Sequence, residues 1–195
     1  MSLADHLAQQ LTDAIAVQEA VLETLVEPLA RAVERMLRCL MADGKILACG
    51  NGAGAALAQL FTASLVHRFE AERPGLAALS LTADAAITSG IAANAGQDRV
   101  YARQIEALGA PGDLLLVVSD DGNDASLLAA LEAAQDKDLG VIALTGHDGG
   151  RLAEALGEAN ILLCVPAHTP ARIHEAQLLV LDGLCEGIDF SLLGA

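Results

Sequence analysis

Two short loops in the sequence combine residue types that bind small ligands. The first, Gly50–Gly54, reads Gly-Asn-Gly-Ala-Gly and separates a short aliphatic run from a helical segment. Glycines at such a turn let backbone N–H groups approach a ligand, and the start of a helix favours an anion. The loop lacks the Gly-Lys-Ser/Thr ending of a Walker A motif and the spacing of a dinucleotide-binding fingerprint. It is therefore either a ligand-binding turn or only a tight connection.

The second loop, Ser119–Asp124, reads Ser-Asp-Asp-Gly-Asn-Asp. The carboxylates of Asp120, Asp121 and Asp124 precede a helical segment, where negative charge satisfies the positive end of the helix dipole. A phosphate arriving there would meet like charge at close range, at a cost of several kcal/mol or more in a partly desolvated site. The loop is thus unsuited to an anion, and a simpler use of Asp121 or Asp124 is to cap the helix.

The elements that must position these loops alternate along the chain from Lys45 onward. Short aliphatic runs are separated by helical segments, and they are Ile46–Cys49, Ala77–Leu81, Leu114–Val118, Val141–Leu144 and Ile161–Val165. Strands that are apolar throughout and separated by helices predict an α/β sandwich, with a parallel sheet covered on both faces. In such sheets ligands collect beyond the carboxyl ends of the strands. The loops that meet there are Gly50–Gly54, Thr82–Asp84, Ser119–Asp124 and Thr145–Gly150.

Helical segments are also predicted at both ends of the chain. The first 43 residues predict two helices, the second opened by Pro28 and running to about Met41. No strand precedes the first helix, so its apolar stripe is predicted to pack against a partner subunit. The stripe consists of Leu3, Leu7, Leu11 and Ile15. The last helix is predicted to begin at Thr169, an N-cap followed by proline, and to run to about Ile188.

The composition limits the classes of partner. The 195 residues suit one domain rather than two, and 53% of them are apolar. The mean hydropathy of +0.44 comes without a long apolar stretch, so subunit contacts explain it better than a membrane span. The net charge of −15 argues against direct binding to a nucleic-acid backbone. The acidity serves either solubility or an acidic surface for a basic protein partner.

The cysteines indicate a reducing compartment. They are widely spaced in apolar runs and form no Cys-x-x-Cys pair, and no basic, apolar leader opens the chain. Buried, reduced thiols in a cytoplasmic protein fit this pattern, and a zinc site built from them is not expected. The four are Cys39, Cys49, Cys164 and Cys185.

Stretches along nearly the whole chain match one family. They are Gly50-Asn51-Gly52, Ala58-Gln59, Phe61, Arg68-Phe69, Glu72-Arg73-Pro74, Leu79, Tyr101 to Gly109, Pro111-Gly112-Asp113, Leu144-Thr145-Gly146, Asp148-Gly149-Gly150 and Arg172-Ile173. With them the chain resembles the bacterial phosphoheptose isomerases of the sugar isomerase (SIS) family. The resemblance implies a flavodoxin-like, five-stranded parallel sheet over residues 44–195 and an N-terminal helical hairpin over residues 1–43. It also implies one SIS domain per chain and a homotetramer with sites between subunits.

The phosphate-binding positions that the resemblance implies are altered. The phosphate-binding serine of the first loop corresponds to Gly54, beside Asn51 and Gly52. In the second loop Ser119, Gly122 and Asn123 match the family, whereas hydroxyl residues of the family correspond to aspartates. Those aspartates are Asp120, Asp121 and Asp124. An Asn-Asp pair of the family falls at Ala93 and Asn94.

The catalytic positions implied by the resemblance are altered as well. A histidine and a general-base glutamate of the family correspond to Leu60 and Ser64, and a glutamine and a second catalytic histidine correspond to His174 and Asp182. Aldose–ketose isomerisation moves a proton between adjacent carbons, and an unactivated hydroxyl such as that of Ser64 is too weak a base for it. On an ideal helix His174 and Asp182 lie roughly 80° apart, so direct pairing is not expected. No catalytic residue and no metal site are therefore predicted, and zinc would be needed only by an active isomerase.

One branch of the family has a similar profile, the DnaA initiator-associating proteins. The resemblance lies in Ala63-Ser64, in Asp182 and in the ending Leu184–Asp189 followed by Leu192-Leu193. It implies a tetrameric, non-catalytic protein that binds the replication initiator DnaA. Two alternatives remain open: an isomerase acting on sedoheptulose 7-phosphate, and a sensor for an uncharged or cationic small molecule. In each case the predicted ligand-binding set is Asn51, Gly52, Gly54, Ser119, Asp120, Asp121, Asn123, Asp124 and His174.

Overall fold

A five-stranded parallel sheet forms the centre of the chain in the computed structural model, which describes residues 1–194. The strand order is β2-β1-β3-β4-β5. The strands are β1 (Ile46–Gly50), β2 (Ala78–Ser80), β3 (Leu114–Val118), β4 (Gly140–Thr145) and β5 (Ile161–Cys164). Each falls within or almost within a predicted aliphatic run, and β1, β3 and β4 are almost wholly buried. The predicted fold class is confirmed.

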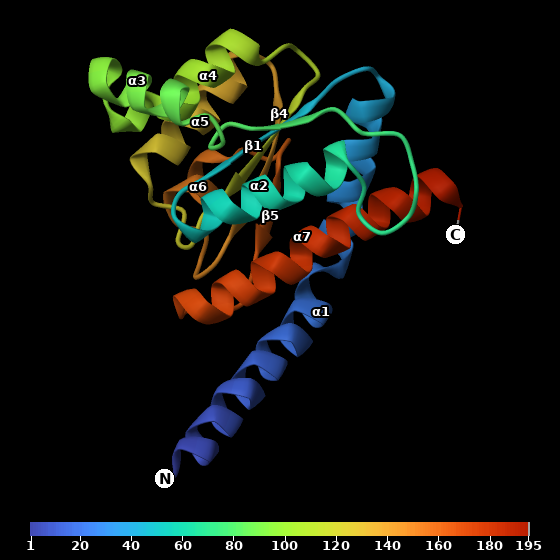
Figure 1. Cartoon of the computed structure of the whole chain (residues 1–195), viewed down its shortest axis with the longest axis vertical. Helices are drawn as coiled ribbons and strands as arrows, with labels where there is room; N and C mark the ends of the chain where they lie inside the picture. The colour runs from blue at the N-terminus through green and yellow to red at the C-terminus, as the bar shows by residue number, and fades with distance from the viewer. Residues whose placement is uncertain (195) are drawn as a thin grey trace.

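Helices cover both faces of this sheet (Figure 1). Alternate strand residues point to opposite sides, so the side chains of Ile46, Leu116 and Ile142 face α1, α2 and α7, whereas Leu47, Leu115 and Val141 face α4, α5 and α6. The helices are α1 (Leu3–Met41), α2 (Ala53–Val66), α3 (Ala85–Ala95), α4 (Val100–Leu108), α5 (Ala125–Asp136), α6 (Gly150–Ala155) and α7 (Pro170–Leu193), with a short 3-10 helix η1 (Gln97–Arg99) before α4.

The predicted N-terminal hairpin is wrong, because residues 3–41 form one continuous helix, α1, with Pro28 inside it. Proline removes one backbone N–H from a helix but does not end it when packing holds both sides. Here Val21 and Leu25 before Pro28, and Ala32 and Met36 after it, all lie buried in the same core. A shared apolar face across the proline therefore keeps the helix whole.

The first half of α1 projects away from the rest of the chain (Figure 1). Its apolar stripe is exposed to solvent, each side chain by at least half: Leu3, Leu7, Leu11 and Ile15. A capping box between Ser2 and Asp5 closes the start of the helix. Such a stripe is stabilised in water only when another surface covers it.

Helix α7 begins where predicted, with Thr169 at the N-cap and Pro170 in the first turn, but continues to Leu193 rather than ending near Ile188. It lies against α1 and α2. Gly187 permits the close approach of α1, because a Cβ at this position would lie 2.7 Å from Val33. No helix among residues 1–194 has the length and apolar character needed to cross a membrane.

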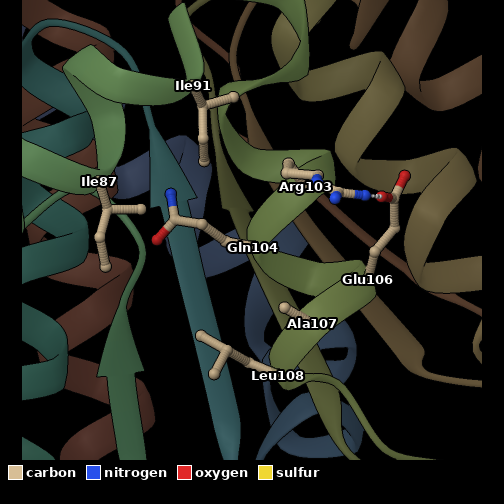
Figure 2. Close-up of a pocket in the computed structure, with 7 residues that line it drawn as sticks. All are labelled: Ile87, Ile91, Arg103, Gln104, Glu106, Ala107 and Leu108. Atoms are coloured by element: carbon tan, nitrogen blue, oxygen red, sulfur yellow. Dashed lines mark hydrogen bonds and ion pairs between the residues drawn. The ribbon is translucent and has the colours of Figure 1, made fainter. Parts of the chain in front are cut away.

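Helix α3 stands out because none of its residues is buried. A groove of about 390 Å³ runs between α3 and α4 (Figure 2). Ile87 and Ile91 line it from α3, and Ala107 and Leu108 line it from α4. The surface formed by α3 and α4 is therefore also partly apolar.

Candidate functional site

The predicted ligand loops meet beyond the carboxyl ends of β1, β3 and β4. Backbone hydrogen bonds join the Ser119–Asp124 loop to the loop after β4 and to α6: the amide of Gly146 donates to the Asp120 carbonyl (3.0 Å), and the amide of Leu152 in α6 donates to the Gly122 carbonyl (2.9 Å). Gly122 has a φ of 74°, and a Cβ there would lie 1.9 Å from the Gly149 carbonyl oxygen. These contacts hold the two loops against each other beyond the carboxyl ends of β3 and β4.

The glycines of the first loop serve close packing of α2 on the sheet. A Cβ at Gly54 would lie 2.6 Å from the carbonyl oxygen of Val118, and a Cβ at Gly50 would lie 2.5 Å from the backbone of Gly54. A serine at position 54 therefore requires α2 to shift away from β3. The position to which the family resemblance assigns a phosphate-binding hydroxyl therefore carries no side chain in this protein, and adding one here would strain the contact between α2 and β3.

A buried polar network lies beneath this loop. The side-chain amide of Asn51 donates to the Ser126 hydroxyl (2.9 Å), and the Tyr101 hydroxyl lies within hydrogen-bonding distance of the Gly50 carbonyl (2.5 Å) and of Asn51 Oδ1 (3.0 Å). Burial raises the pKa of Tyr101 to about 12, with smaller contributions from Cys49 and Asp124. Tyr101 is therefore a hydrogen-bond donor at neutral pH and not a base.

Sequence reasoning missed Tyr101 and Ser126 as residues of this site. The available signal was that Tyr101 is the single tyrosine of the chain and begins one of the matched stretches. Its contact with Gly50 joins residues 51 positions apart, so spacing along the sequence gave no indication of it.

Most polar groups of the second loop bond within the loop region. The Ser119 hydroxyl accepts from the Gly122 amide (3.0 Å), and Asp121 Oδ1 accepts from the Asn123 amide (3.0 Å). The side-chain oxygen of Asn123 accepts from the Arg151 amide (3.3 Å). The loop is thus held in shape without a ligand.

The predicted cap of α5 is partly realised. Asp124 occupies the N-cap position, but its side chain forms no capping hydrogen bond, and Asp121 bonds to Asn123 instead. Both carboxylates are exposed. Two negative charges therefore remain at the start of α5, where the helix dipole favours them.

His174 pairs with Asp120 rather than with Asp182. Its Nε2 lies 2.9 Å from Asp120 Oδ1, which joins the first turns of α7 to the loop after β3. Nearby, Gln177 donates from Nε2 to the Ser119 carbonyl (2.7 Å). Two side chains of α7 thus bind two consecutive residues of the loop.

The remaining predicted positions lie on α2 and further along α7. Leu60 is about half exposed, and the Ser64 hydroxyl donates to the Leu60 carbonyl (3.1 Å). Burial, and to a smaller extent the charge of Glu70, raise the pKa of Asp182. Within residues 1–194 no hydrogen bond or ion pair joins Asp182 to His174 or to Ser64, so these residues form no single polar constellation within one chain.

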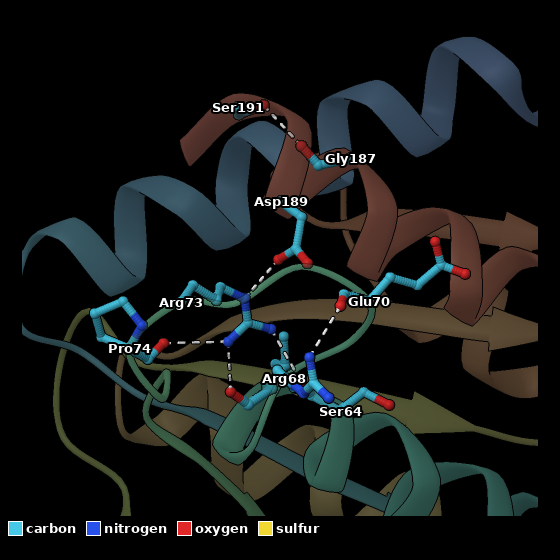
Figure 3. Close-up of polar contacts among 9 residues, drawn as sticks. Ser64, Arg68, Glu70, Arg73, Pro74, Gly187, Asp189 and Ser191 are labelled. Carbon is cyan, nitrogen blue, oxygen red and sulfur yellow. Dashed lines mark hydrogen bonds and ion pairs between the residues drawn. The ribbon is translucent and has the colours of Figure 1, made fainter. Parts of the chain in front are cut away.

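The end of α2 that carries Ser64 is fixed by a buried ion pair (Figure 3). Arg73 donates to the carbonyls of Ser64 and Leu65, each at 2.9 Å, and pairs with Asp189 of α7. The two charged side chains are 1% and 7% exposed. This pair anchors the segment after α2 to α7.

The family model described as SIS domain matches residues 10–146. The chain belongs to the SIS-domain family. It is 47% identical over 194 residues to a phosphoheptose isomerase of Azoarcus sp. strain BH72, covering 100% of this chain and 98% of that protein. It is 43% identical over 188 residues to the DnaA initiator-associating protein DiaA of Photorhabdus laumondii, covering 96% of each.

Solved structures of SIS proteins superpose closely on the fold. Phosphoheptose isomerase GmhA from Neisseria gonorrhoeae matches with a TM-score of 0.92 and 41% identity, over 96% of this chain and 99% of that chain. A phosphoheptose isomerase from Francisella tularensis matches with a TM-score of 0.94 and 36% identity, over 97% of this chain and 99% of that one. Relatives with both names resemble this SIS protein over nearly their whole length, so overall similarity does not separate an enzyme from an initiator-associating protein.

The side chains of this SIS chain that could bind a metal ion are those of its His, Cys, Asp and Glu residues. Within the described residues, no three His, Cys, Asp or Glu side chains are placed to hold one ion. The four cysteines are free thiols, and burial raises the pKa of Cys49 and Cys185. Within residues 1–194, these side chains do not fit a zinc site built from one chain alone.

Proposed function

We propose that this SIS protein is a non-catalytic, homotetrameric regulator, similar in role to the DnaA initiator-associating proteins. Its altered sugar-phosphate cleft is the region between the Gly50–Gly54 loop and the Ser119–Asp124 loop. The proposal rests on the side chains found at Leu60 and Ser64 and on their contacts. Where the family resemblance implies a general base and a histidine, the chain has a hydroxyl bonded to its own helix and a half-exposed aliphatic side chain.

Neither Tyr101 nor a pair of His174 with Asp182 replaces the missing base. Isomerisation needs an acid or base whose pKa lies near the operating pH. Tyr101, with a pKa of about 12, does not meet this condition. His174 is bonded to Asp120 and is separated from Asp182 by two helical turns.

Exposed apolar surface supports assembly and a protein partner. The stripe on α1 and the groove between α3 and α4 expose apolar side chains that a second subunit would cover. We infer a cytoplasmic tetramer whose acidic surface binds a protein, with the replication initiator DnaA as the candidate given by the name of a relative.

A second candidate is a phosphoheptose isomerase that acts on sedoheptulose 7-phosphate. Two observations favour it: relatives of that name match the full chain, and His174 with Asp120 forms a histidine–carboxylate pair at the cleft. Histidine is the side chain that most often serves as a general acid or base in enzymes, although this one lies on a different element from Ser64.

A turnover assay separates the two candidates. Purified protein is incubated with sedoheptulose 7-phosphate, with and without zinc, and the product is followed by NMR. The gonococcal phosphoheptose isomerase serves as positive control. We expect no conversion above background, and turnover on the order of 1 per second or faster would contradict the proposal. Light scattering tests the assembly: we expect a tetramer, and a stable monomer at micromolar concentration would contradict it.

A further inference from the structure

A second cavity lies at the amino ends of the strands, whereas the Gly50–Gly54 and Ser119–Asp124 loops lie at their carboxyl ends. It is open to solvent, has a volume of about 440 Å³ and is lined by the end of α1 and the amino ends of β3 and β4. Arg35 and Arg38 reach it from α1, and Asp138 and Gly140 reach it from the start of β4. Its position beside the amino ends of the strands separates it from the Ser119–Asp124 loop.

Arg35 is held in place at this cavity without a carboxylate partner. Its guanidinium donates to the Ala159 carbonyl and lies over Gly140, where a Cβ would be 2.7 Å from Nη2. Among the residues that the structure describes, no acidic side chain forms a salt bridge with it. Burial, and then the charge of Arg38, lower the pKa of Arg35. Two neighbouring cations that repel each other therefore face one cavity.

Within the part of the chain that the structure describes, the acidic groups around the cavity make no close contact with its two arginines. Asp113 is bound by the Lys45 ammonium and accepts from the backbone amides of Lys45 and Ala110 (each 2.9 Å), and these contacts lower its pKa. The contact between Arg38 and Glu34 is 3.9 Å long and exposed on both sides, so it contributes little. Asp138 is the remaining acidic side chain that lines the cavity, and it forms no salt bridge within residues 1–194.

We propose that this cavity binds a small ligand through a phosphate group held between Arg35 and Arg38. A guanidinium donates two parallel hydrogen bonds to phosphate oxygens, and a doubly charged anion relieves the repulsion between two arginines. The volume of the cavity is larger than a phosphate group alone would fill. Cys39, Ala42 and Leu114 supply an apolar wall for the rest of the ligand.

Calorimetric titration of the full-length protein with inorganic phosphate tests the proposal. We expect a dissociation constant on the order of 1 mM. Arg35→Gln and Arg38→Gln should each weaken binding at least tenfold, and Asp138→Asn should tighten it, because a repelling charge is removed. Arg38 is exposed, so its variant keeps the test valid if Arg35→Gln does not fold. Arg103→Gln is the matched control: it removes the same charge from α4, away from the cavity, and should leave binding unchanged.

Three results would overturn the proposal. The first is that the unmodified protein shows no binding at about 10 mM phosphate, well above the expected dissociation constant of about 1 mM. The second is that Arg103→Gln loses as much binding as the two cavity variants. The third is that the dicarboxylate malonate binds as tightly as phosphate. The first removes the site, the second reduces it to general charge attraction, and the third removes the assignment to phosphate.

Discussion

Two side-chain pairs, one arginine–aspartate and one histidine–aspartate, join helix α7 to other parts of the chain, and they differ sharply in burial. Asp189 near its end pairs with Arg73, with side chains 7% and 1% exposed, whereas His174 near its start pairs with Asp120, with side chains 31% and 42% exposed. The buried pair fixes the end of α2 and has no access to a ligand. The exposed pair joins α7 to the Ser119–Asp124 loop, and its replacement is expected to cost the fold little. The contact that stabilises the SIS fold and the contact that borders the predicted ligand loop are therefore separate contacts of one helix.

The largest effect is expected from Asp189→Asn. This change leaves the Arg73 guanidinium buried without a charged partner, which costs about 3–5 kcal/mol. Thermal unfolding should show a fall in Tm of roughly 10 °C at matched protein concentration. Asp120→Asn is the control, because its partner His174 is partly exposed, and it should cost less than about 1 kcal/mol. Equal losses in the two variants would remove the distinction between the pairs.

A smaller loss is expected from Gly54→Ser, which tests whether α2 needs a glycine at this position to pack on the sheet. A side chain at position 54 meets the Val118 carbonyl, and such overpacking costs about 1–3 kcal/mol. Urea unfolding measures this cost. Ala53→Ser introduces the same hydroxyl one residue earlier in the same turn and should be close to neutral. If the two serines have the same effect, the glycine is not required by the packing of α2.

A still smaller, pH-dependent effect is expected at Asp182. Because its pKa is raised in the folded state, ionised Asp182 disfavours folding at neutral pH, and this penalty is relieved as the pH falls through the folded pKa toward the ordinary value of 3.8. Asp182→Asn should therefore raise stability at pH 7 by less than about 1 kcal/mol, and the gain should shrink near pH 4. Tm measurements at both pH values test this, and a gain that grows on acidification would reverse the sign of the argument.

The strands were predictable from the sequence because parallel strands buried on both faces must be apolar throughout. The continuous helix α1 was not predicted, because Pro28 resembles a helix start. What keeps the helix whole is an apolar face shared by residues on both sides of the proline: Val21, Leu25, Ala32 and Met36. The loops of the site were located by their place after β1 and β3. The pairing of His174 with Asp120 was not predictable, since it joins residues 54 positions apart and depends on how α7 crosses the sheet. The ligand-binding roles of the loop residues remain predictions.

We propose that the carboxylates of Asp121 and Asp124, both exposed at the start of α5, keep sugar phosphates from binding there. The most direct test is calorimetric titration of sedoheptulose 7-phosphate into two proteins, one with Arg38→Gln alone and one that also carries Asp121→Ser and Asp124→Ser. The Arg38→Gln background weakens the second cavity as a competing site, and Arg38 is exposed, so the change should leave the fold intact. We expect no measurable binding to the first protein and at least tenfold tighter binding to the second, since like charge no longer opposes the phosphate. Low-micromolar binding to the protein that keeps both aspartates would contradict the claim.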